Sequence, residues 1–306
     1  MSELRFDGRV AVITGAGRGL GRSYALLLAA EGAKVVVNDP GGAIKGEGSD
    51  AGPAQDVVAE IVAAGGEAIA NLDSVATPEG GAAIVQAAIE AYGRIDILIH
   101  NAGNVRYGGL DELSQEDFDA VLDVHLRGAY HVVRAAFPLM RDAGYGRIVL
   151  TSSIGGIYGN QRCVNYGVSK AGMIGLSNIA ALEGEGHDVR CNVIVPSAVT
   201  RMAEGIDVSA YPPMQPELVA PVVGWLCHES CSITGEMLAA IAGRVAKVYV
   251  AETQGVYQPS WTIDQVGERI DAIRDATEPL AFGLHGHVDH IVYSFGMATK
   301  GGRDDA

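Results

Sequence analysis

Short runs of apolar residues recur along most of the chain, and each is followed by a stretch with helical periodicity. The runs cover residues 9–14, 34–38, 67–71, 95–100, 146–152 and 189–195. Runs that are apolar throughout are typical of strands buried on both faces, and the amphipathic stretches between them are typical of crossover helices. The pattern therefore predicts an α/β fold built on a doubly wound parallel sheet.

The alternation weakens beyond residue 243, which indicates a change of organisation. Residues 244–252 predict a strand, residues 262–276 predict a helix, and the remainder is expected to be irregular. The Gly-rich segment 38–53 is expected to be a loop. We expect one domain over residues 1–243, with residues 244–306 as a C-terminal extension packed on the same domain.

Composition narrows the classes of protein that the chain can belong to. Its 306 residues are 48% hydrophobic and carry a net charge of −15. This charge argues against nucleic acid or an anionic membrane as the main partner. No window approaches about 18 continuous apolar residues, and the N-terminus lacks the apolar stretch of a signal peptide, so we expect a cytoplasmic location. In that compartment Cys163, Cys191, Cys227 and Cys231 are expected to be free thiols.

A glycine-rich segment, "TGAGRGLG" at 14–21, follows the first predicted strand. It places Gly15, Gly19 and Gly21 where a strand turns into a helix. Such a turn needs positive φ, close approach to a pyrophosphate and tight helix packing, which glycine permits at little cost. The spacing T-G-x-x-x-G-x-G does not fit G-x-G-x-x-G, and a glycine-rich turn without a ligand is the alternative.

Asp39 follows the second predicted strand, 18 residues beyond Gly21. A carboxylate there can accept hydrogen bonds from both ribose hydroxyls of a dinucleotide and repels a 2′-phosphate, which favours NAD over NADP. Arg18 favours NADP instead, because a basic side chain in the loop can pair with such a phosphate. We give more weight to Asp39, since it stands at the ribose itself.

The segment "VNYGVSK" at 164–170 places Tyr166 and Lys170 four residues apart. On a helix these residues share one face, and a cation there can lower the pKa of a phenol from about 10. The spacing alone is also found on solvated helix faces. Its meaning depends on the rest of the chain.

With "NAG" at 101–103, and with Ser153 standing 13 residues before Tyr166, the chain resembles the short-chain dehydrogenase/reductase family. The resemblance runs from about residue 6 to residue 243 and implies a Rossmann fold, a nicotinamide cofactor and a homodimer or homotetramer. The segments "LRFDGRV", "VHLRGAY", "YGRIVLTSS" and "WLCHES" resemble (3R)-hydroxyacyl-CoA dehydrogenases of this family. This likeness implies NAD-dependent oxidation of a (3R)-hydroxyacyl-CoA. A hydroxysteroid or steroid-fragment substrate, or 3-oxoacyl reduction in the reverse direction, are the alternatives.

The resemblance also implies a role for each site residue. Tyr166 would be the general acid/base, Lys170 would hold the nicotinamide ribose and lower the pKa of Tyr166, and Ser153 would donate a hydrogen bond to the substrate oxygen. The residues expected to bind the cofactor are Gly15, Arg18, Gly19, Leu20, Gly21, Asp39, Asp73, Asn101, Ala102, Gly103, Tyr166, Lys170, Pro196, Val199 and Thr200.

Two of the expected site residues have ordinary structural alternatives. His125 stands where the family usually has Asn and falls on the inward face of a predicted helix, so it is either a core histidine or part of a proton path from Lys170 to bulk water. Asp73 either meets the adenine amino group or caps a turn. The segment 201–217 is expected to cover the substrate.

Three other interpretations are weighed against this one. "HGHVDH" at 285–290 matches a metal-binding pattern, but the His and Asp ligands that complete such sites do not follow, so no metal is expected. "CHESC" at 227–231 is expected to lie in a half-buried helix that begins near Pro216. A non-catalytic dinucleotide-binding scaffold is disfavoured, because it would not need Ser153, Tyr166 and Lys170 together.

Overall fold

The structure is a computed structural model that describes residues 4–43, 45–200 and 210–300, without the side chain of Lys300. It divides into two compact units, Met1–Lys247 and Val248–Ala306. The boundary lies a few residues beyond the one predicted at 243. The packing of the extension on the first unit stays a prediction.

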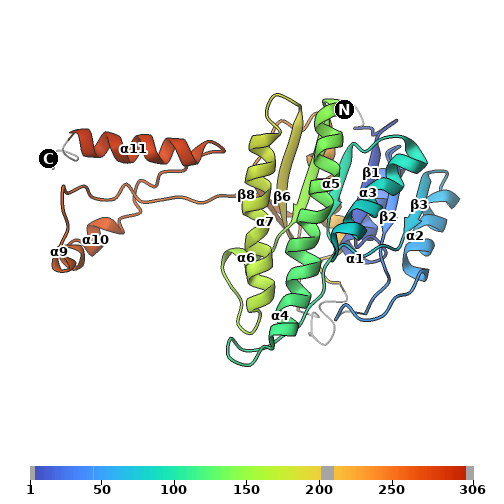
Figure 1. The fold of residues 1–306 in the computed structure, drawn as a ribbon, viewed down its shortest axis with the longest axis horizontal. Coiled ribbons are helices and arrows are strands. Elements are labelled where there is room, and N and C mark those ends of the chain that lie inside the picture. The colour runs from blue at the N-terminus through green and yellow to red at the C-terminus, as the bar shows by residue number, and fades with distance from the viewer. Residues whose placement is uncertain (1–3, 44, 201–209, 301–306) are drawn as a thin grey trace. The chain divides into compact units, whose positions relative to one another are not determined.

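An eight-stranded sheet forms the centre of the first unit, in the order β3-β2-β1-β4-β5-β6-β7-β8 (Figure 1). The strands β1 to β7 pair in parallel. Their bounds are Val10–Thr14 (β1), Lys34–Asn38 (β2), Glu67–Asn71 (β3), Ile97–His100 (β4), Gly146–Thr151 (β5), Val189–Ser197 (β6), Met237–Ile241 (β7) and Arg244–Val248 (β8). The strand order reverses at β1, so the predicted doubly wound sheet is confirmed.

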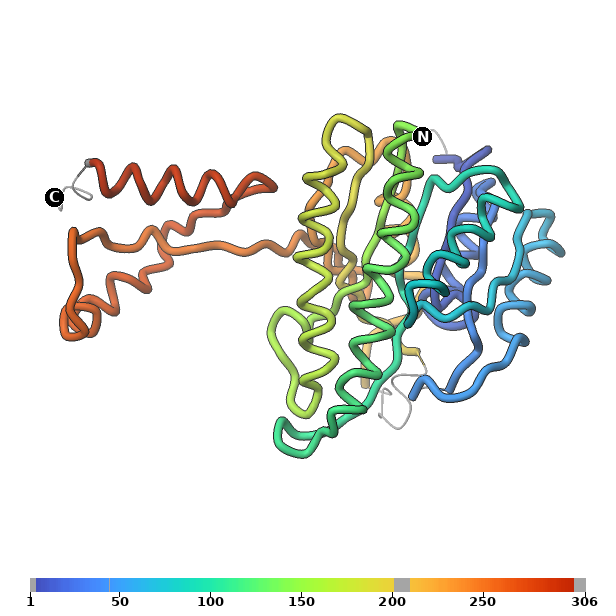
Figure 2. The backbone as a smooth tube through the Cα atoms, in the orientation of Figure 1, coloured from blue at the N-terminus to red at the C-terminus, as the bar shows by residue number. Residues whose placement is uncertain are grey.

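Helices cover both faces of this sheet (Figures 1 and 2). One face carries α1 (Gly19–Ala30), α2 (Gly52–Ala63) and α8 (Ala220–Cys227), and the other carries α3 (Pro78–Tyr92), α4 (Gln115–Leu122), α5 (Gly128–Ala143) and α7 (Val164–Glu183). A π-turn, η1 (Asp123–Arg127), joins α4 to α5. Two short elements, α6 (Ile154–Ile157) and η3 (Pro216–Leu218), lie in the connections.

The central predicted strands are among the most deeply buried segments of the chain, whereas β3 and β8, at the edges of the sheet, have no buried residue. Every residue of β1, β4 and β5 is buried, as expected for strands covered by helices on both faces. Side-chain caps mark the starts of two helices on the second face: Thr77 accepts a hydrogen bond from Gly80 N, and Ser114 accepts one from Asp117 N. These local signals fix where each crossover helix begins.

The second unit departs from its prediction in two places. The helix predicted over 262–276 is two short helices, α9 (Ile263–Glu268) and α10 (Ile270–Ile273), because the backbone leaves helical geometry at Arg269 (φ −102°, ψ 9°). The remainder, predicted as irregular, contains α11 (Gly286–Lys300). The helix α11 contains glycines and β-branched residues, which have low helix propensity. Its sequence therefore does not predict a helix.

A third correction concerns "CHESC". The helix α8 ends at Cys227, and His228 has extended backbone geometry, so residues 228–231 lie beyond the helix rather than within it. Cys227 and Cys231 are fully buried, not half-buried. Across the part of the chain that the structure describes, no helix combines the length and apolar character that a membrane crossing requires.

Candidate active site

The expected site residues gather at the carboxyl edge of the parallel strands. Gly15 follows β1, Asp39 follows β2, Asn101 follows β4 and Ser153 follows β5. Pro196 lies near the end of β6. Ligands of open α/β sheets bind at this edge, beside the point where the strand order reverses, so the sequence-predicted site occupies the expected place in the fold.

The glycine loop leaves no room for side chains on its inner side. A Cβ on Gly15 would lie 2.7 Å from Ala102 Cα, and a Cβ on Gly21 would lie 2.2 Å from Gly15 O. Gly15 and Gly19 also have positive φ, 63° and 54°. Asn101 Nδ2 donates to Gly15 O at 3.1 Å and ties the loop to β4. The loop ends at the N-terminus of α1, where backbone N–H groups favour an anion, so the geometry fits a dinucleotide pyrophosphate.

Asp39 is held against this loop by backbone donors. Its Oδ2 accepts a hydrogen bond from Gly17 N at 2.9 Å, and its Oδ1 accepts one from Gly41 N at 2.7 Å. Next to Gly17, Arg18 keeps a buried Nη1 without a hydrogen-bond partner among the described residues. The loop therefore offers both a fixed carboxylate and a guanidinium nitrogen with bonding capacity to spare, which are the two features that distinguish ribose from its 2′-phosphate.

The other residues expected at the cofactor lie at the same edge with different environments. Thr200 Cγ2 would be 3.2 Å from a Cβ on Gly19, so the segment after β6 approaches the loop. Asp73 is exposed, and its carboxylate accepts a hydrogen bond from Asn71 Nδ2 at 2.8 Å, the turn-stabilising contact of the alternative interpretation. Leu20, Pro196 and Thr200 are half-buried, and Gly103 and Val199 are exposed. Of the predicted covering segment 201–217, residues 201–209 lie outside the described residues.

Tyr166 and Lys170 lie one turn apart on α7, as predicted. Lys170 is 3% exposed, and its Nζ donates to Thr151 O at 2.7 Å and lies 5.6 Å from the centroid of the Tyr166 ring. Burial lowers the pKa of Lys170 to about 7. Ser153 lies close enough to lower the pKa of the Tyr166 phenol, and a Cβ on Gly155 would lie 3.6 Å from both Ser153 Oγ and Tyr166 Cε1. The three side chains expected to carry the chemistry are therefore together.

The pKa of Tyr166 differs from the expectation. Burial raises it above its ordinary value, and Ser153 offsets only part of that increase. A buried phenolate is costly, and burial also disfavours the charge on Lys170, so the cation is less effective than the spacing alone suggested. Additional positive charge near the phenol would oppose this increase in the pKa of Tyr166.

Several residues that support the site were missed in the sequence. Asn165 is fully buried, and its Nδ2 donates to Arg106 O at 3.0 Å and to Asp117 O at 3.1 Å. Its Oδ1 accepts a hydrogen bond from Tyr166 N, which fixes the first turn of α7. Ser152 Oγ donates to Lys170 O at 2.7 Å. No spacing rule identifies Asn165 and Ser152, because the groups to which they donate are backbone carbonyls 18 to 59 residues away in the sequence.

His125 points inward, as its helical face predicted, and is 2% exposed. Its Nε2 lies 2.8 Å from Asn104 O and 3.1 Å from Asn104 N, while Nδ1 has no hydrogen-bond partner among the described residues. The ring meets Tyr166 edge-on, with centroids 5.5 Å apart at 83°. Burial, followed by the charge of Lys170, lowers the pKa of His125 well below its usual range. Its part in a proton path stays a prediction.

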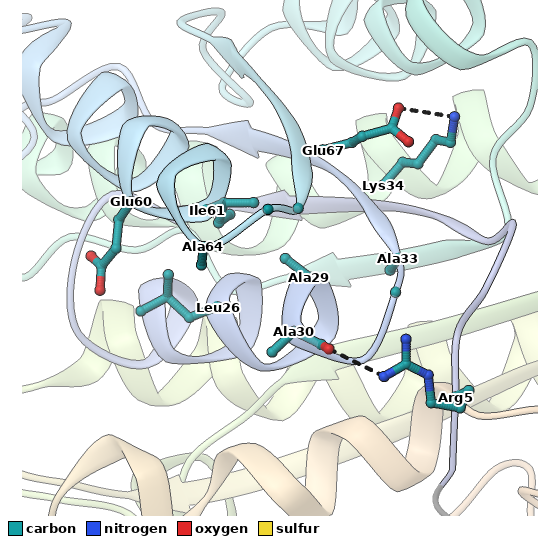
Figure 3. A pocket seen from close by; sticks show the side chains of 13 residues that line it. Arg5, Leu26, Ala29, Ala30, Ala33, Lys34, Glu60, Ile61, Ala64 and Glu67 are labelled. Atoms are coloured by element: carbon teal, nitrogen blue, oxygen red, sulfur yellow. Dashed lines mark hydrogen bonds and ion pairs between the residues drawn. The ribbon is translucent and has the colours of Figure 1, made fainter.

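Each unit holds one further feature. A cavity of about 430 Å³ opens at the amino ends of β2 and β3, lined by Arg5, Leu26, Ile61 and the Lys34–Glu67 ion pair (Figure 3). In the second unit, His290 of "HGHVDH" pairs with Glu252 at 3.0 Å. Within residues 4–43, 45–200 and 210–300, no group of three or more His, Cys, Asp or Glu side chains could hold a metal ion.

Comparison with known proteins gives a family model and similar sequences. The family model described as short chain dehydrogenase matches residues 9–208. The chain is 51% identical over 261 residues to peroxisomal multifunctional enzyme type 2 of Drosophila melanogaster, covering 84% of this chain and 43% of that protein. It is 46% identical over 252 residues to a short-chain type dehydrogenase/reductase of Mycobacterium tuberculosis, covering 81% and 87%.

A solved structure of the Drosophila melanogaster relative also matches the chain. The structure of full-length peroxisomal multifunctional enzyme type 2 from Drosophila melanogaster matches with a TM-score of 0.79 and 40% identity, over 95% of this chain and 50% of that one. The chain thus spans half or less of the length of this multifunctional relative. The sequence and fold comparisons agree on one family.

Proposed function

This chain belongs to the short-chain dehydrogenase/reductase family, and we propose that it uses NAD to oxidise a (3R)-hydroxyacyl-CoA to the 3-oxoacyl-CoA. The observation that carries the proposal is the grouping of Ser153, Tyr166 and Lys170 beside the glycine loop. The substrate class is supported by the similarity to enzymes named peroxisomal multifunctional enzyme type 2. The family uses nicotinamide cofactors, and it is a family of dehydrogenases.

The choice of NAD rests on Asp39. Its carboxylate, fixed by Gly17 N and Gly41 N, would accept hydrogen bonds from the ribose hydroxyls and repel a 2′-phosphate. Arg18, which lies in the glycine loop, would contact the phosphates of the cofactor. When bound, the nicotinamide supplies the hydride acceptor for the reaction. Gly15, Gly19 and Gly21 would admit the pyrophosphate, with Asn101, Ala102, Gly103 and Thr200 along the groove.

Proton transfer falls to Tyr166. Its Oη would accept the proton of the substrate hydroxyl as the hydride leaves the carbinol carbon, and Ser153 Oγ would donate a hydrogen bond to the same oxygen. Lys170, with its pKa of about 7, would stabilise the phenolate and hold the nicotinamide ribose. Tyr166, whose ionised form burial disfavours, would be ionised more easily beside the positive charge of a bound oxidised nicotinamide, because opposite charge favours the phenolate.

A second copy of the chain is the partner we propose, in a homodimer or homotetramer. Four large apolar side chains are exposed on α5 and α7: Tyr130 (51%), Leu139 (41%), Val168 (46%) and Ile179 (55%). Apolar groups in such number on two adjacent helices are typical of an interface. We also propose a cytoplasmic location, which the four free cysteines of the described chain support.

The proposal is tested by NADH formation at 340 nm. Purified protein is offered (3R)-hydroxyacyl-CoAs, their (3S) isomers and a panel of hydroxysteroids, each with NAD and with NADP. We expect turnover of the (3R) thioesters with NAD and a loss of at least about 100-fold in Tyr166→Phe. Turnover of steroids alone would overturn the substrate assignment and keep the mechanism. Equal activity of wild type and Tyr166→Phe would overturn the mechanism.

A separate experiment tests the assignment of NAD as the cofactor. In Asp39→Ala the preference for NAD over NADP, measured as the ratio of kcat/KM values, should fall about tenfold or more, because the repulsion of the 2′-phosphate is removed. Asp50→Ala, in the exposed part of the same loop, is the matched control and should leave the ratio unchanged. A preference that survives in Asp39→Ala would show that another group selects the cofactor.

A further inference from the structure

His100, the last residue of β4, takes no part in the function described so far, although it is fully buried next to the site. In the sheet it lies directly beside Thr14 of β1, the residue before the glycine loop. Most buried polar side-chain atoms have a hydrogen-bond partner, and an imidazole has two ring nitrogens to satisfy. His100 has both: Nδ1 lies 3.1 Å from Thr14 Oγ1, and Nε2 lies 2.9 Å from the carbonyl oxygen of His125.

The hydrogen bonds of Thr14 determine which nitrogen of His100 carries the proton. Thr14 Oγ1 accepts hydrogen bonds from Asn101 N and Ala102 N, both at 3.1 Å. A hydroxyl has two acceptor sites and one proton. Both acceptor sites are taken, so the proton of Thr14 points to Nδ1 of His100. Nδ1 is therefore an acceptor, and Nε2 bears the hydrogen that is donated to His125 O.

The carbonyl that His100 holds belongs to the π-turn η1. In this turn Gly128 N–H reaches back to Asp123 O, one residue further than in an α-helix, and it also contacts His125 O. The His125 carbonyl therefore accepts from this backbone group as well as from His100, and turns of this kind occur often at functional sites. Burial, with the charge of Lys170 second, lowers the pKa of His100 to about 3, so His100 remains a neutral donor throughout the working range.

Holding this carbonyl also fixes the ring of the same residue. The His125 ring is confined on one side by Gly103, where an added Cβ would lie 2.5 Å from Cε1, and it meets Tyr166 edge-on at 5.5 Å. A continuous series of contacts thus runs from Thr14 through His100 and His125 to the phenol ring. We propose that His100 is a positioning residue for Tyr166, acting through the His125 carbonyl that it holds in the π-turn.

The matched test compares two amides at position 100. His100→Gln places an amide donor where Nε2 stood and can reach His125 O, whereas His100→Asn can reach only Thr14. We expect kcat to fall about tenfold in His100→Asn and to recover to within about threefold of wild type in His100→Gln, with the dissociation constant of NAD unchanged. His131→Gln is the control, because His131 contacts a carbonyl outside η1, Val75 O at 3.0 Å, through Nδ1, the ring nitrogen that Gln does not replace. It should lower Tm without changing kcat.

A second readout is independent of the substrate. The ionisation of Tyr166 is followed by NMR with tyrosine labelled at Cζ, assigned with Tyr166→Phe, and we expect its midpoint to shift in His100→Asn but not in His131→Gln. In wild-type protein, ¹⁵N-labelled histidine should show His100 protonated at Nε2 and unchanged from pH 5 to 9. These measurements separate this proposal from the proposed function, which fails if no hydroxyacyl-CoA is turned over.

Three results would overturn the positioning role. They are a His100 that carries its proton on Nδ1, a His100→Asn variant with wild-type Tyr166 ionisation, and a His100→Gln variant that folds but is as impaired as His100→Asn. The tautomer measurement uses the unaltered protein, so a proton on Nδ1 would overturn the proposal even where a substitution prevents folding.

Discussion

At the scale of single residues, burial sets the electrostatics of the site more than spacing does. Lys170 and His125 are both almost completely buried, and burial is the first cause of the lowered pKa of each. The same effect raises the pKa of Tyr166. A charged group that must work in this environment is held there at a cost to the stability of the fold.

Lys170→Met should therefore stabilise the protein while it abolishes activity. The pKa of Lys170 is lower in the folded than in the unfolded state, so the unfolded state binds more protons between pH 7 and the usual lysine range, and wild-type stability rises with pH there. The gain in unfolding free energy should be about 1–3 kcal/mol at pH 6 and should shrink as the pH rises toward 10. Urea denaturation at both pH values measures it.

Lys34→Met is the control for this experiment. Lys34 is 37% exposed and forms an ion pair with Glu67, so its replacement should change stability by less than about 1 kcal/mol. A destabilised Lys170→Met at pH 6 would mean that the hydrogen bond to Thr151 O outweighs the cost of the buried charge.

For His125, the proton-path hypothesis predicts a kinetic effect distinct from that of a core histidine. His125→Asn should lower kcat less than His125→Ala, because Asn keeps a polar group near Asn104, and both should alter the pH profile of kcat. A solvent isotope effect on kcat would report a slower proton transfer. Wild-type turnover and an unchanged profile in both variants would leave His125 as a core residue only.

At the scale of elements, strain is stored in the connection that leads into α7. Arg162, just before the helix that carries Tyr166, has φ 60°, and Ala242 in the turn between β7 and β8 has φ 48°. Non-glycine residues pay about 1 kcal/mol or more for this left-handed conformation. Arg162 also forms an exposed ion pair with Glu112 at 2.7 Å. The side chain of Ala242 is a single methyl group, so replacing it by glycine removes no ion pair.

Glycine at these two positions should therefore give different results. Ala242→Gly should raise the unfolding free energy by about 0.5–1 kcal/mol, since it relieves the left-handed strain alone. Arg162→Gly should gain less, because the ion pair with Glu112 is lost. Thermal or urea denaturation checks both, and destabilisation in both variants would show that neither backbone conformation is strained.

At the scale of the whole molecule, the property to test is the association of the chain with a second copy of itself. The exposed apolar residues of α5 and α7 lie on the face of the sheet opposite to α1, α2 and α8. If a second copy covers α7, a charge at Ile179 should weaken assembly by about tenfold or more, because it would be buried without a partner.

Ile179→Glu and Val62→Glu form a matched pair for this experiment. Both residues are 55% exposed, but Val62 lies on α2, on the other face. Sedimentation velocity should show dissociation of Ile179→Glu at micromolar concentration and a wild-type profile for Val62→Glu. A wild-type protein that is monomeric, or an unaffected Ile179→Glu, would contradict the proposed interface.

Local patterns in the sequence were sufficient for the strands, the glycine loop and the pairing of Tyr166 with Lys170. Each depends on neighbours within one element: apolar runs for β1 and β4, glycine where a strand turns into α1, and a separation of four residues on α7. The resemblance to the family added Ser153 and the cofactor groove. Periodicity was a poorer guide where propensity is low, as in α11.

Only the tertiary structure decided the properties that depend on distant partners. The proton on His100 follows from Thr14, which lies on another strand, and the two hydrogen bonds to Asp39 come from backbone groups of separate turns. The direction of the Tyr166 pKa shift follows from burial, which the spacing of two residues does not reveal. Sequence patterns describe which groups share an element, whereas solvent exclusion and long-range hydrogen bonds exist only once the elements have packed.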